Sequence, residues 1–245
     1  MKKSVLSMVA VAVLAVPAAM ADTIGGVYLG ADLHFADAKG GFGQTGNQQD
    51  FDFDDKNLSS FYIKVEHPVP LLPNIKLQRN SLNSNGNTTL NQTFVFDSQI
   101  FAVGTDVAQD VDLSNIDATF YYEILDNVVN ADIGLGATSL NGDVKTLGLS
   151  KTNIDKTVPV IYGSAGVKLP FTGLSAKGEL LYSNFNDTKI TDAQAELQYN
   201  FIDNLLVDVG LKAGYRILDI KLDDYEKNDL KFNFKGPYIG LDVHF

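Results

Sequence analysis

The chain of 245 residues contains no cysteine. A disulfide framework, a thiol nucleophile and a thiolate metal site are therefore excluded. Basic residues are in the minority, because 19 Lys and Arg stand against 30 Asp and Glu, which gives a formal net charge of −11. Binding nucleic acid through its phosphates requires clustered basic side chains, so this acidic balance argues against a nucleic-acid partner.

Long hydrophobic runs are missing, and the one apolar stretch at the N-terminus is short. Lys2 and Lys3 precede an apolar segment at 4–16, and residues 19–21 (Ala-Met-Ala) form the small-x-small pattern that signal peptidase reads. We expect cleavage before Asp22, and no cysteine of a lipoprotein signal follows. An uncleaved anchor helix, the alternative, needs a run of ~20 apolar residues.

The sequence thus predicts a signal peptide, 1–21, and one mature domain, 22–245, whose charge falls to near −13 with the loss of two lysines. Apolar and polar residues alternate along most of this domain, as where Val207, Val209 and Leu211 share one face. A period of two indicates β-strands, whereas a helix repeats every three or four residues. The predicted strands lie at roughly 24–35, 58–69, 74–82, 113–125, 128–140, 158–169, 174–185, 190–201, 205–219 and 231–245.

The connections between these strands alternate in length. Short turns are expected at 71–74, 126–127, 170–173 and 202–204, and longer polar links at 36–57, 83–112 and 141–157, with shorter ones at 186–189 and 220–230. This alternation is typical of barrels with short periplasmic turns and longer surface loops. The sequence therefore predicts an all-β fold, an antiparallel up-and-down transmembrane β-barrel of about ten strands, within a range of eight to twelve.

The segment 83–112 leaves the number of strands open. Its apolar pieces, 94–96 and 100–103, either extend the flanking strands above the membrane as a hairpin or make two further transmembrane strands, which gives twelve. Their alternation is poor and the link is rich in Asn and Asp, which favours the hairpin.

A soluble β-sandwich is the main alternative, because its strands also alternate. Three features favour the barrel. The polar face mixes glycine with charges of both signs, aromatic residues gather near strand ends, and the chain ends in an alternating strand with a terminal aromatic residue. The strand-end aromatic residues are Phe35, Phe61, Phe120, Tyr182, Phe185, Tyr199, Phe201 and Phe245.

The last strand resembles the signal by which the outer-membrane assembly machinery recognises unfolded barrels. Its apolar residues alternate up to the end of the chain: Ile239, Leu241, Val243 and Phe245. An extended strand of this kind is suited to adding to an exposed sheet edge of that machinery. We therefore expect the barrel assembly machinery to be a partner during biogenesis.

A wider resemblance adds to this pattern. Gly25-Gly26 follows the predicted cleavage site, and the segments 113–117, 121–127 and 236–241 complete the match. Together they resemble a proteobacterial family of outer-membrane β-barrel proteins with a Gly-Gly pair near the mature N-terminus. The resemblance implies the outer membrane of a Gram-negative bacterium, with its lipids and lipopolysaccharide as partners. The family carries no established activity and implies no cofactor.

Residues suited to catalysis or metal binding are sparse. The only histidines are His34, His67 and His244, and no Gly-x-Ser-x-Gly elbow occurs. The acidic run at 50–55 has oxygen ligands at alternate positions, but Asp55 stands where a calcium loop of the EF-hand type needs glycine. We therefore expect no enzyme activity and no metal site, and we expect the acidic run to be a solvated strand extension.

Charged residues on the polar strand faces are the most informative set. Alternation directs these side chains into the lumen: Asp32, Lys64, Glu66, Asp132, Lys177, Glu179, Glu196, Asp208, Lys212 and Arg216. Isolated charges there are costly, so they should pair across strands or hold water. A salt-bridged plug and a narrow polar pore are both open, and the plug is favoured because side chains nearly fill barrels of eight to ten strands.

These observations predict a non-enzymatic outer-membrane barrel with a structural or surface-interaction role. The alternative is a narrow, porin-like channel for small solutes, similar to OmpW-type proteins. A lipid-modifying barrel enzyme is a third hypothesis, which the sparse histidines disfavour.

Overall fold

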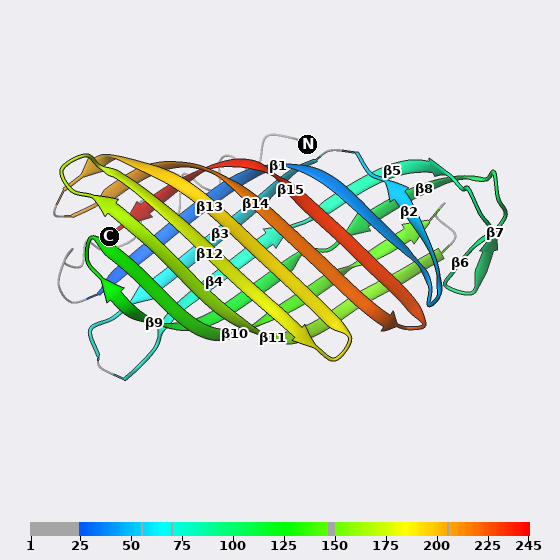
Figure 1. Ribbon diagram of the computed structural model, residues 1–245, viewed down its shortest axis with the longest axis horizontal. Coiled ribbons are helices and arrows are strands. Elements are labelled where there is room, and N and C mark those ends of the chain that lie inside the picture. The colour runs from blue at the N-terminus through cyan, green and yellow to red at the C-terminus, as the bar shows by residue number, and fades with distance from the viewer. Residues whose placement is uncertain (1–24, 55, 70, 147–149, 205) are drawn as a thin grey trace.

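The barrel wall consists of ten antiparallel strands that close on themselves (Figure 1). The computed structural model describes residues 25–54, 56–69, 71–146, 150–204 and 206–245, so the predicted signal peptide lies outside the described part. In pairing order, the wall strands are β1 (Gly26–Gln44), β3 (Lys56–Glu66), β4 (Asn74–Ser81), β9 (Asn115–Asp126), β10 (Val129–Thr146), β11 (Ser150–Leu169), β12 (Leu174–Phe185), β13 (Thr188–Asp203), β14 (Asp208–Tyr225) and β15 (Asn228–His244). The circle closes where β15 pairs with β1. This arrangement confirms the predicted all-β barrel of ten strands.

Within the described ranges, no helix has both the length and the apolar character needed to cross a membrane.

The segment 83–112 adds no strand to the circle of ten. Its two arms, β5 (Asn83–Thr89) and β8 (Asp106–Asp112), pair with each other, and β8 also pairs with the far end of β10. Between them, β6 (Phe94–Phe96) and β7 (Gln99–Phe101) form a small separate hairpin at one end of the barrel (Figure 1). The predicted hairpin is therefore confirmed in preference to two further wall strands.

The expectation of long polar loops is wrong, because the barrel strands continue through them. Within the predicted link 141–157, the described residues 141–146 and 150–155 are paired backbone, with Asn141 opposite Asp155 and Lys145 opposite Lys151. The link 36–57 likewise holds the outer part of β1 and the short strand β2 (Asn47–Asp52), which pairs with it. The link 220–230 lies almost wholly in β14 and β15.

The polarity of the two strand faces reverses along these long strands. On β1, Leu33 and Phe35 point outward and are exposed, while Asp32 is buried inside the barrel. Further along the same strand, Lys39 is exposed and Phe42 is completely buried. The alternation of inward and outward positions is unbroken, but the apolar residues change from the outer face to the inner face.

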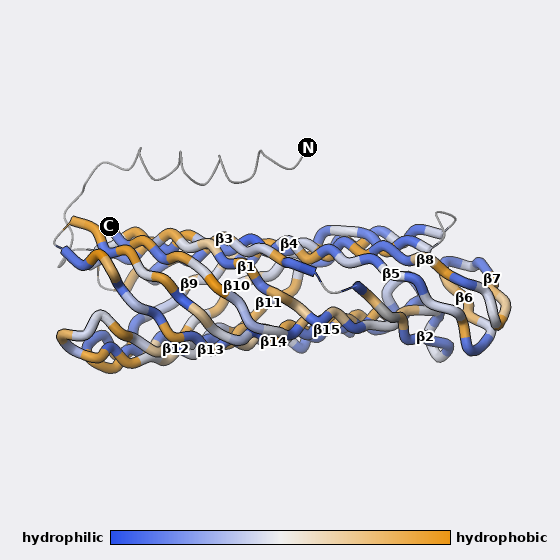
Figure 2. Tube along the Cα trace, turned by 90° about the horizontal axis from the view of Figure 1, so that it is seen from above, coloured by the Kyte–Doolittle hydropathy of each residue, from blue (hydrophilic) through white to orange (hydrophobic). Residues whose placement is uncertain are grey.

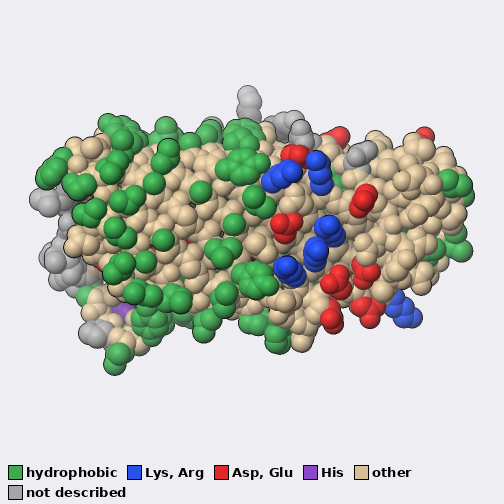
Figure 3. Space-filling model, viewed as in Figure 1, with side chains coloured by type: hydrophobic (Ala, Val, Ile, Leu, Met, Phe, Trp, Pro, Cys, Tyr) green, Lys and Arg blue, Asp and Glu red, His purple; other side chains and the backbone are tan. Residues whose placement is uncertain are grey.

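The reversal occurs at a similar level on neighbouring strands. On β14 the outward residues change from Ile217 to Asp219, and on β15 they change from Pro237 to Lys235. Figure 3 shows the result as a hydrophobic surface over one part of the barrel and a band of charged side chains beside it. An apolar exterior around a polar interior is the pattern of a barrel wall that faces lipid.

Candidate functional site: the barrel interior

Polar side chains from all ten wall strands fill the interior of the barrel where its exterior is apolar. One contributor from each strand, in pairing order, is Asp32, Tyr62, Asn80, Asp117, Thr138, Tyr162, Glu179, Glu196, Lys212 and Asp242. They join three clusters of ion pairs and hydrogen bonds.

Lys212 is the centre of the first cluster and is only 2% exposed. Its Nζ lies 3.0 Å from the carboxylate of Asp32 and 3.7 Å from that of Glu196. The same ammonium group stands 4.6 Å from the centre of the Tyr62 ring, and the Tyr62 hydroxyl donates to Asp242. The buried lysine charge is thus compensated by two carboxylates and an aromatic face.

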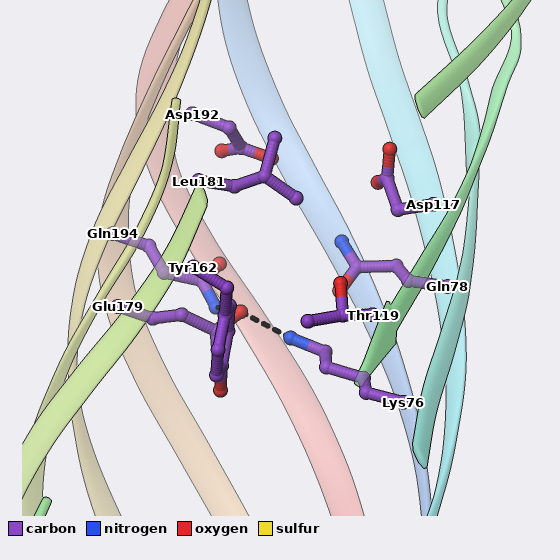
Figure 4. Close-up of a pocket in the computed structure, with 9 residues that line it drawn as sticks. All are labelled: Lys76, Gln78, Asp117, Thr119, Tyr162, Glu179, Leu181, Asp192 and Gln194. Atoms are coloured by element: carbon purple, nitrogen blue, oxygen red, sulfur yellow. Dashed lines mark hydrogen bonds and ion pairs between the residues drawn. The ribbon is translucent and has the colours of Figure 1, made fainter. Parts of the chain in front are cut away.

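Glu179 is the centre of the second cluster. It forms an ion pair with Lys76, drawn as a dashed line in Figure 4, and a second with Lys177 at 3.2 Å. Its carboxylate also accepts hydrogen bonds from the Tyr162 hydroxyl at 3.0 Å and from Gln194 at 3.4 Å. Since β4 and β12 are not neighbours in the wall, the pair of Lys76 and Glu179 crosses the lumen.

Arg216 is the centre of the third cluster. Its guanidinium donates twice to Asp192, at 2.8 and 2.5 Å, in the bidentate geometry that suits a carboxylate. It also donates to Asn80 at 2.9 Å, and Asn80 in turn donates to Asp117 at 3.0 Å. This chain leads from β14 to β4, again across the lumen.

The gap left between these clusters is very small. Figure 4 shows Asp192 and Gln194 facing Asp117 and Gln78 across it. The cavity that these side chains line has a volume of about 10 Å³. One water molecule needs about 10–15 Å³ on this measure, so this cavity has room for one water at most.

The other charged residues that were predicted to face the lumen lie nearer the end of the barrel where short turns join the strands. Asp132 accepts from the Ser164 hydroxyl at 2.6 Å, and Glu66 accepts from the Tyr121 hydroxyl at 2.7 Å. Asp208 stands 3.5 Å from His244. Glu66 and Asp132 line a polar vestibule of about 140 Å³ at that end.

Lys64 lines this vestibule and has no carboxylate within 4.0 Å of its ammonium group among the described residues. Its ammonium group faces the rings of Tyr28, Tyr62 and Tyr121, each at about 6 Å. Cation–π attraction of this kind offsets part of the cost of removing a lysine from water.

Sequence reasoning missed several members of the clusters. Asp192 and Asn80 were not among the expected lumen residues, although both occupy inward positions of the same alternation. The inward tyrosines were missed as well, and they donate to the buried carboxylates. A tyrosine at a polar position of an alternating strand was the signal that could have revealed them.

Beyond the level where the faces reverse, the interior is an apolar plug. Its buried residues include Ala36, Ala38, Phe42, Phe51, Leu58, Leu82, Phe94, Phe96, Phe101, Val111, Leu140, Ile154, Leu218, Ile220, Phe232 and Phe234. The ring of Phe42 stacks on Phe51 with centroids 4.2 Å apart, and Phe96 meets Phe42 edge-on at 4.8 Å. Phe51 was expected in a solvated strand extension, but it is buried because β2 folds its inner face onto this plug.

The histidines do not come together. His34 is buried inside β1, and its Nε2 has no hydrogen-bond partner. His67 contacts the carbonyl of Pro73 at 3.2 Å, beside the turn after β3. His244 stacks on Tyr28 with ring centroids 4.0 Å apart. Within the part of the chain that the structure describes, no group of three or more potential metal ligands is found.

The C-terminal strand is held in the wall up to the last residue. Ile239 and Leu241 are exposed on the outer face, and Val243 and Phe245 are half-buried. The backbone of Phe245 exchanges two hydrogen bonds with Val27, at 3.0 and 3.1 Å. The terminal strand is therefore part of the seam between β15 and β1.

Comparison with known proteins identifies the architecture. No family model matches the chain, and no curated protein matches it in sequence. Among solved structures, the outer membrane protease OmpT of Escherichia coli is similar, with a TM-score of 0.54, 11% identity, and coverage of 90% of this chain and 97% of that one.

Two further solved structures match less well. The transport unit of the Escherichia coli autotransporter AIDA-I has a TM-score of 0.38 and 10% identity, and covers 97% of this chain and 94% of its own. A Pseudomonas aeruginosa FadL homologue has a TM-score of 0.35 and 9% identity, with coverage of 91% and 90%. With the closed wall of ten strands and its apolar band, the chain is a bacterial outer-membrane β-barrel, set in a lipid environment.

Proposed function

We propose that this outer-membrane barrel is closed and non-enzymatic, with a structural or surface-interaction role and a lumen plugged by its own side chains. The main support for this proposal is the set of ion pairs and hydrogen bonds that crosses the lumen and leaves a cavity of about 10 Å³. The apolar plug stands in series with these clusters. A continuous path of water through the lumen would require both the polar clusters and the apolar plug to open.

The cost of breaking them supports a closed state. Removing one partner of a buried ion pair costs about 3–5 kcal/mol, because the other charge is left unpaired. Barrels of about this strand number are filled by side chains, and open aqueous channels occur in barrels of about sixteen strands.

Planar-bilayer recording tests the proposal. The wild-type protein inserted into a bilayer should give no steady single-channel steps, whatever the sign of the voltage. A matched preparation of a known porin shows that insertion and recording work. Steady unitary steps from the wild-type protein would overturn the closed state.

A narrow channel for small solutes is the second candidate. The polar vestibule of about 140 Å³ at the end with the short turns favours it, because charged side chains there would keep water and small ions inside the mouth. Liposome swelling in small sugars and amino acids separates the candidates. The closed barrel predicts swelling no faster than in empty liposomes.

The absence of enzyme activity is also part of the proposal. The likeness to a protease shares only the fold, at 11% identity. The one contact between a histidine and a carboxylate, His244 with Asp208 at 3.5 Å, has no hydroxyl bonded to its imidazole among the described residues. Lipid A and phospholipid profiles should stay unchanged when the protein is overproduced, and a new lipid product would refute this part.

The assembly machinery is the proposed partner of the C-terminal strand during biogenesis, and lipopolysaccharide is the proposed partner of the outer wall. For the first, Phe245→Ser should shift the protein from outer-membrane to periplasmic fractions. Phe201→Ser is the matched control, because Phe201 is also an aromatic residue near a strand end but lies outside the last strand. Equal outer-membrane yields of Phe245→Ser and wild type would contradict a role for the terminal residue.

A further inference from the structure

Three outward lysines lie in one row across neighbouring strands. Lys189 on β13 is directly opposite Lys221 on β14, and Lys221 is directly opposite Lys231 on β15. The Cβ atoms of directly opposed residues are about 5 Å apart, and like charges in such pairs repel each other. In the described ranges, no carboxylate lies within 4.0 Å of these three ammonium groups.

Three other outward lysines of the barrel do have such partners, whereas Lys235 has none within 4.0 Å among the described residues. Lys39 lies 3.5 Å from Asp37, and Lys145 and Lys151 lie 2.7 and 3.4 Å from Asp143. An unpaired row of three is therefore not the general state of lysines on this wall. A ligand that carries negative charge would relieve the repulsion within the row.

The row stands just outside the apolar band. On β14, the last exposed apolar residue is Ile217, and Lys221 follows four residues later, about 13 Å along the strand. Figure 3 shows basic side chains beside the edge of the hydrophobic surface. Lipid headgroups occupy this level of a membrane, and long lysine side chains reach toward them.

A groove lies at the β15 end of the row. It has a volume of about 540 Å³. Its lining combines Lys231, Lys39, Asn233 and Phe53 with three carboxylates that can accept hydrogen bonds from sugar hydroxyls, namely Asp37, Asp50 and Asp219. Gly40 also lies in the lining, where a Cβ would come 2.7 Å from the Lys231 carbonyl oxygen and from the Phe232 ring, and 3.1 Å from the Phe53 ring. An aromatic ring beside charged and amide side chains suits a sugar, which presents both CH groups and hydroxyls.

We propose that this face of β13, β14, β15 and β1 binds the phosphorylated sugar head of lipopolysaccharide. The phosphates lie on Lys189, Lys221 and Lys231, and a sugar ring occupies the groove beside Lys231. This inference rests on the proposed lipopolysaccharide partner and names its site. It is independent of whether the lumen conducts, so a conductance result leaves it untouched.

Binding of purified lipopolysaccharide to the detergent-folded protein tests the site. The triple variant Lys189→Gln, Lys221→Gln and Lys231→Gln should bind about a hundredfold more weakly, at about fivefold per lysine near a membrane surface. The matched control is Lys145→Gln, Lys151→Gln and Lys156→Gln, which removes the same charge from lysines of β10 and β11, outside the proposed face. We expect the control to lose at most a few fold.

Two further binding measurements distinguish phosphate groups of lipopolysaccharide from free phosphate as the ligand. Dephosphorylated lipopolysaccharide should bind wild type about as weakly as the triple variant binds the intact lipid. Inorganic phosphate at the same concentration should not compete. Equal losses in the two triple variants, or full competition by inorganic phosphate, would overturn the site. Should the triple variant fail to fold, Lys221→Gln alone should show the fivefold loss, and unchanged binding would refute the proposal.

Discussion

The membrane-facing and outer parts of this barrel are built on the same strands but have opposite interiors. In the membrane-facing part, Lys212 and Glu179 lie inside and Leu211 faces out. In the outer part, Phe42 lies inside and Lys39 faces out. The medium around the wall decides which face is apolar, while the strand geometry stays the same. The outer part is organised as a water-soluble barrel with an ordinary hydrophobic core.

The two interiors are stabilised by different interactions. Burial of apolar side chains away from water stabilises the outer plug. In the membrane-facing part, apolar residues face lipid, so the interior depends on satisfying each buried charge and hydroxyl. Figure 2 shows the two parts as successive stretches of one continuous barrel. Substitutions should therefore have opposite consequences on the two sides of the level where the faces reverse.

The largest effect is expected in the charged interior. Lys212→Met should lower the free energy of unfolding by about 3–5 kcal/mol, because Asp32 and Glu196 lose their buried cation. Denaturant unfolding in detergent measures it, and Lys231→Met, an exposed lysine of the outer part, is the control with a change near zero. Equal stability of both variants would show that the clusters contribute nothing.

The second-largest loss of stability is expected for a substitution in the apolar plug of the outer part. Phe42→Ala should cost about 3 kcal/mol, because a completely buried ring is lost among other phenylalanines. Phe61→Ala, on the lipid face, should cost much less, since acyl chains fill the space that the ring leaves. Equal costs in the same unfolding assay would contradict a plug that packs as a core.

The cost of placing a charge on the outer face should show where the apolar band ends. Ile217→Lys should cost up to about 1 kcal/mol in a bilayer, because it places a charge on the lipid face close to the edge of the apolar band. Asp219→Lys, two residues further along β14, should cost nothing measurable. Folding titrations in lipid vesicles compare the two, and similar costs would move the edge away from this pair.

The smallest effect is expected at a turn beyond the membrane. Burial raises the pKa of Asp229, but hydrogen bonds from the Asp224 amide at 2.8 Å, from Gln48 at 2.7 Å and from Thr45 outweigh it and hold the pKa below its usual value. The stabilisation is therefore complete above about pH 4, the ordinary value of a free aspartate, and is lost as the pH falls through the lower folded value.

Asp229→Asn should therefore increase hydrogen exchange at the Asp224 amide at pH 7. The difference from wild type should shrink as the pH falls through the lowered pKa of Asp229, after correction for intrinsic exchange rates. A difference that grows on acidification would reverse the assigned sign.

The sequence was sufficient to predict the ten wall strands, because alternation against lipid is a local pattern. It was not sufficient for the outer halves of the strands, because there the apolar residues lie on the other face, as at Ala36 and Phe42. The polar segments between the predicted strands then resembled loops. Strand length follows from continued pairing, as between Lys145 and Lys151, and not from polarity alone.

The pairs across the lumen were beyond sequence reasoning. Arg216 donates to Asn80, which is 136 residues away in the chain. Which inward residues share one level depends on the stagger and tilt of all ten strands, and those are properties of the closed wall. Alternation predicted that Arg216 points inward, but its partner Asp192 was identified only in the folded barrel.

Spin-label scanning along β14 tests the reversal of faces most directly. The chain has no native cysteine, so single cysteines at the outward positions 209, 211, 213, 215, 217, 219, 221 and 223 can be labelled without background. In lipid bilayers, we expect high oxygen accessibility from 209 to 217 and a change to high accessibility for a water-soluble nickel complex at 219 and beyond. Labels in lipid up to 223, or in water throughout 209–217, would contradict a membrane edge between Ile217 and Asp219.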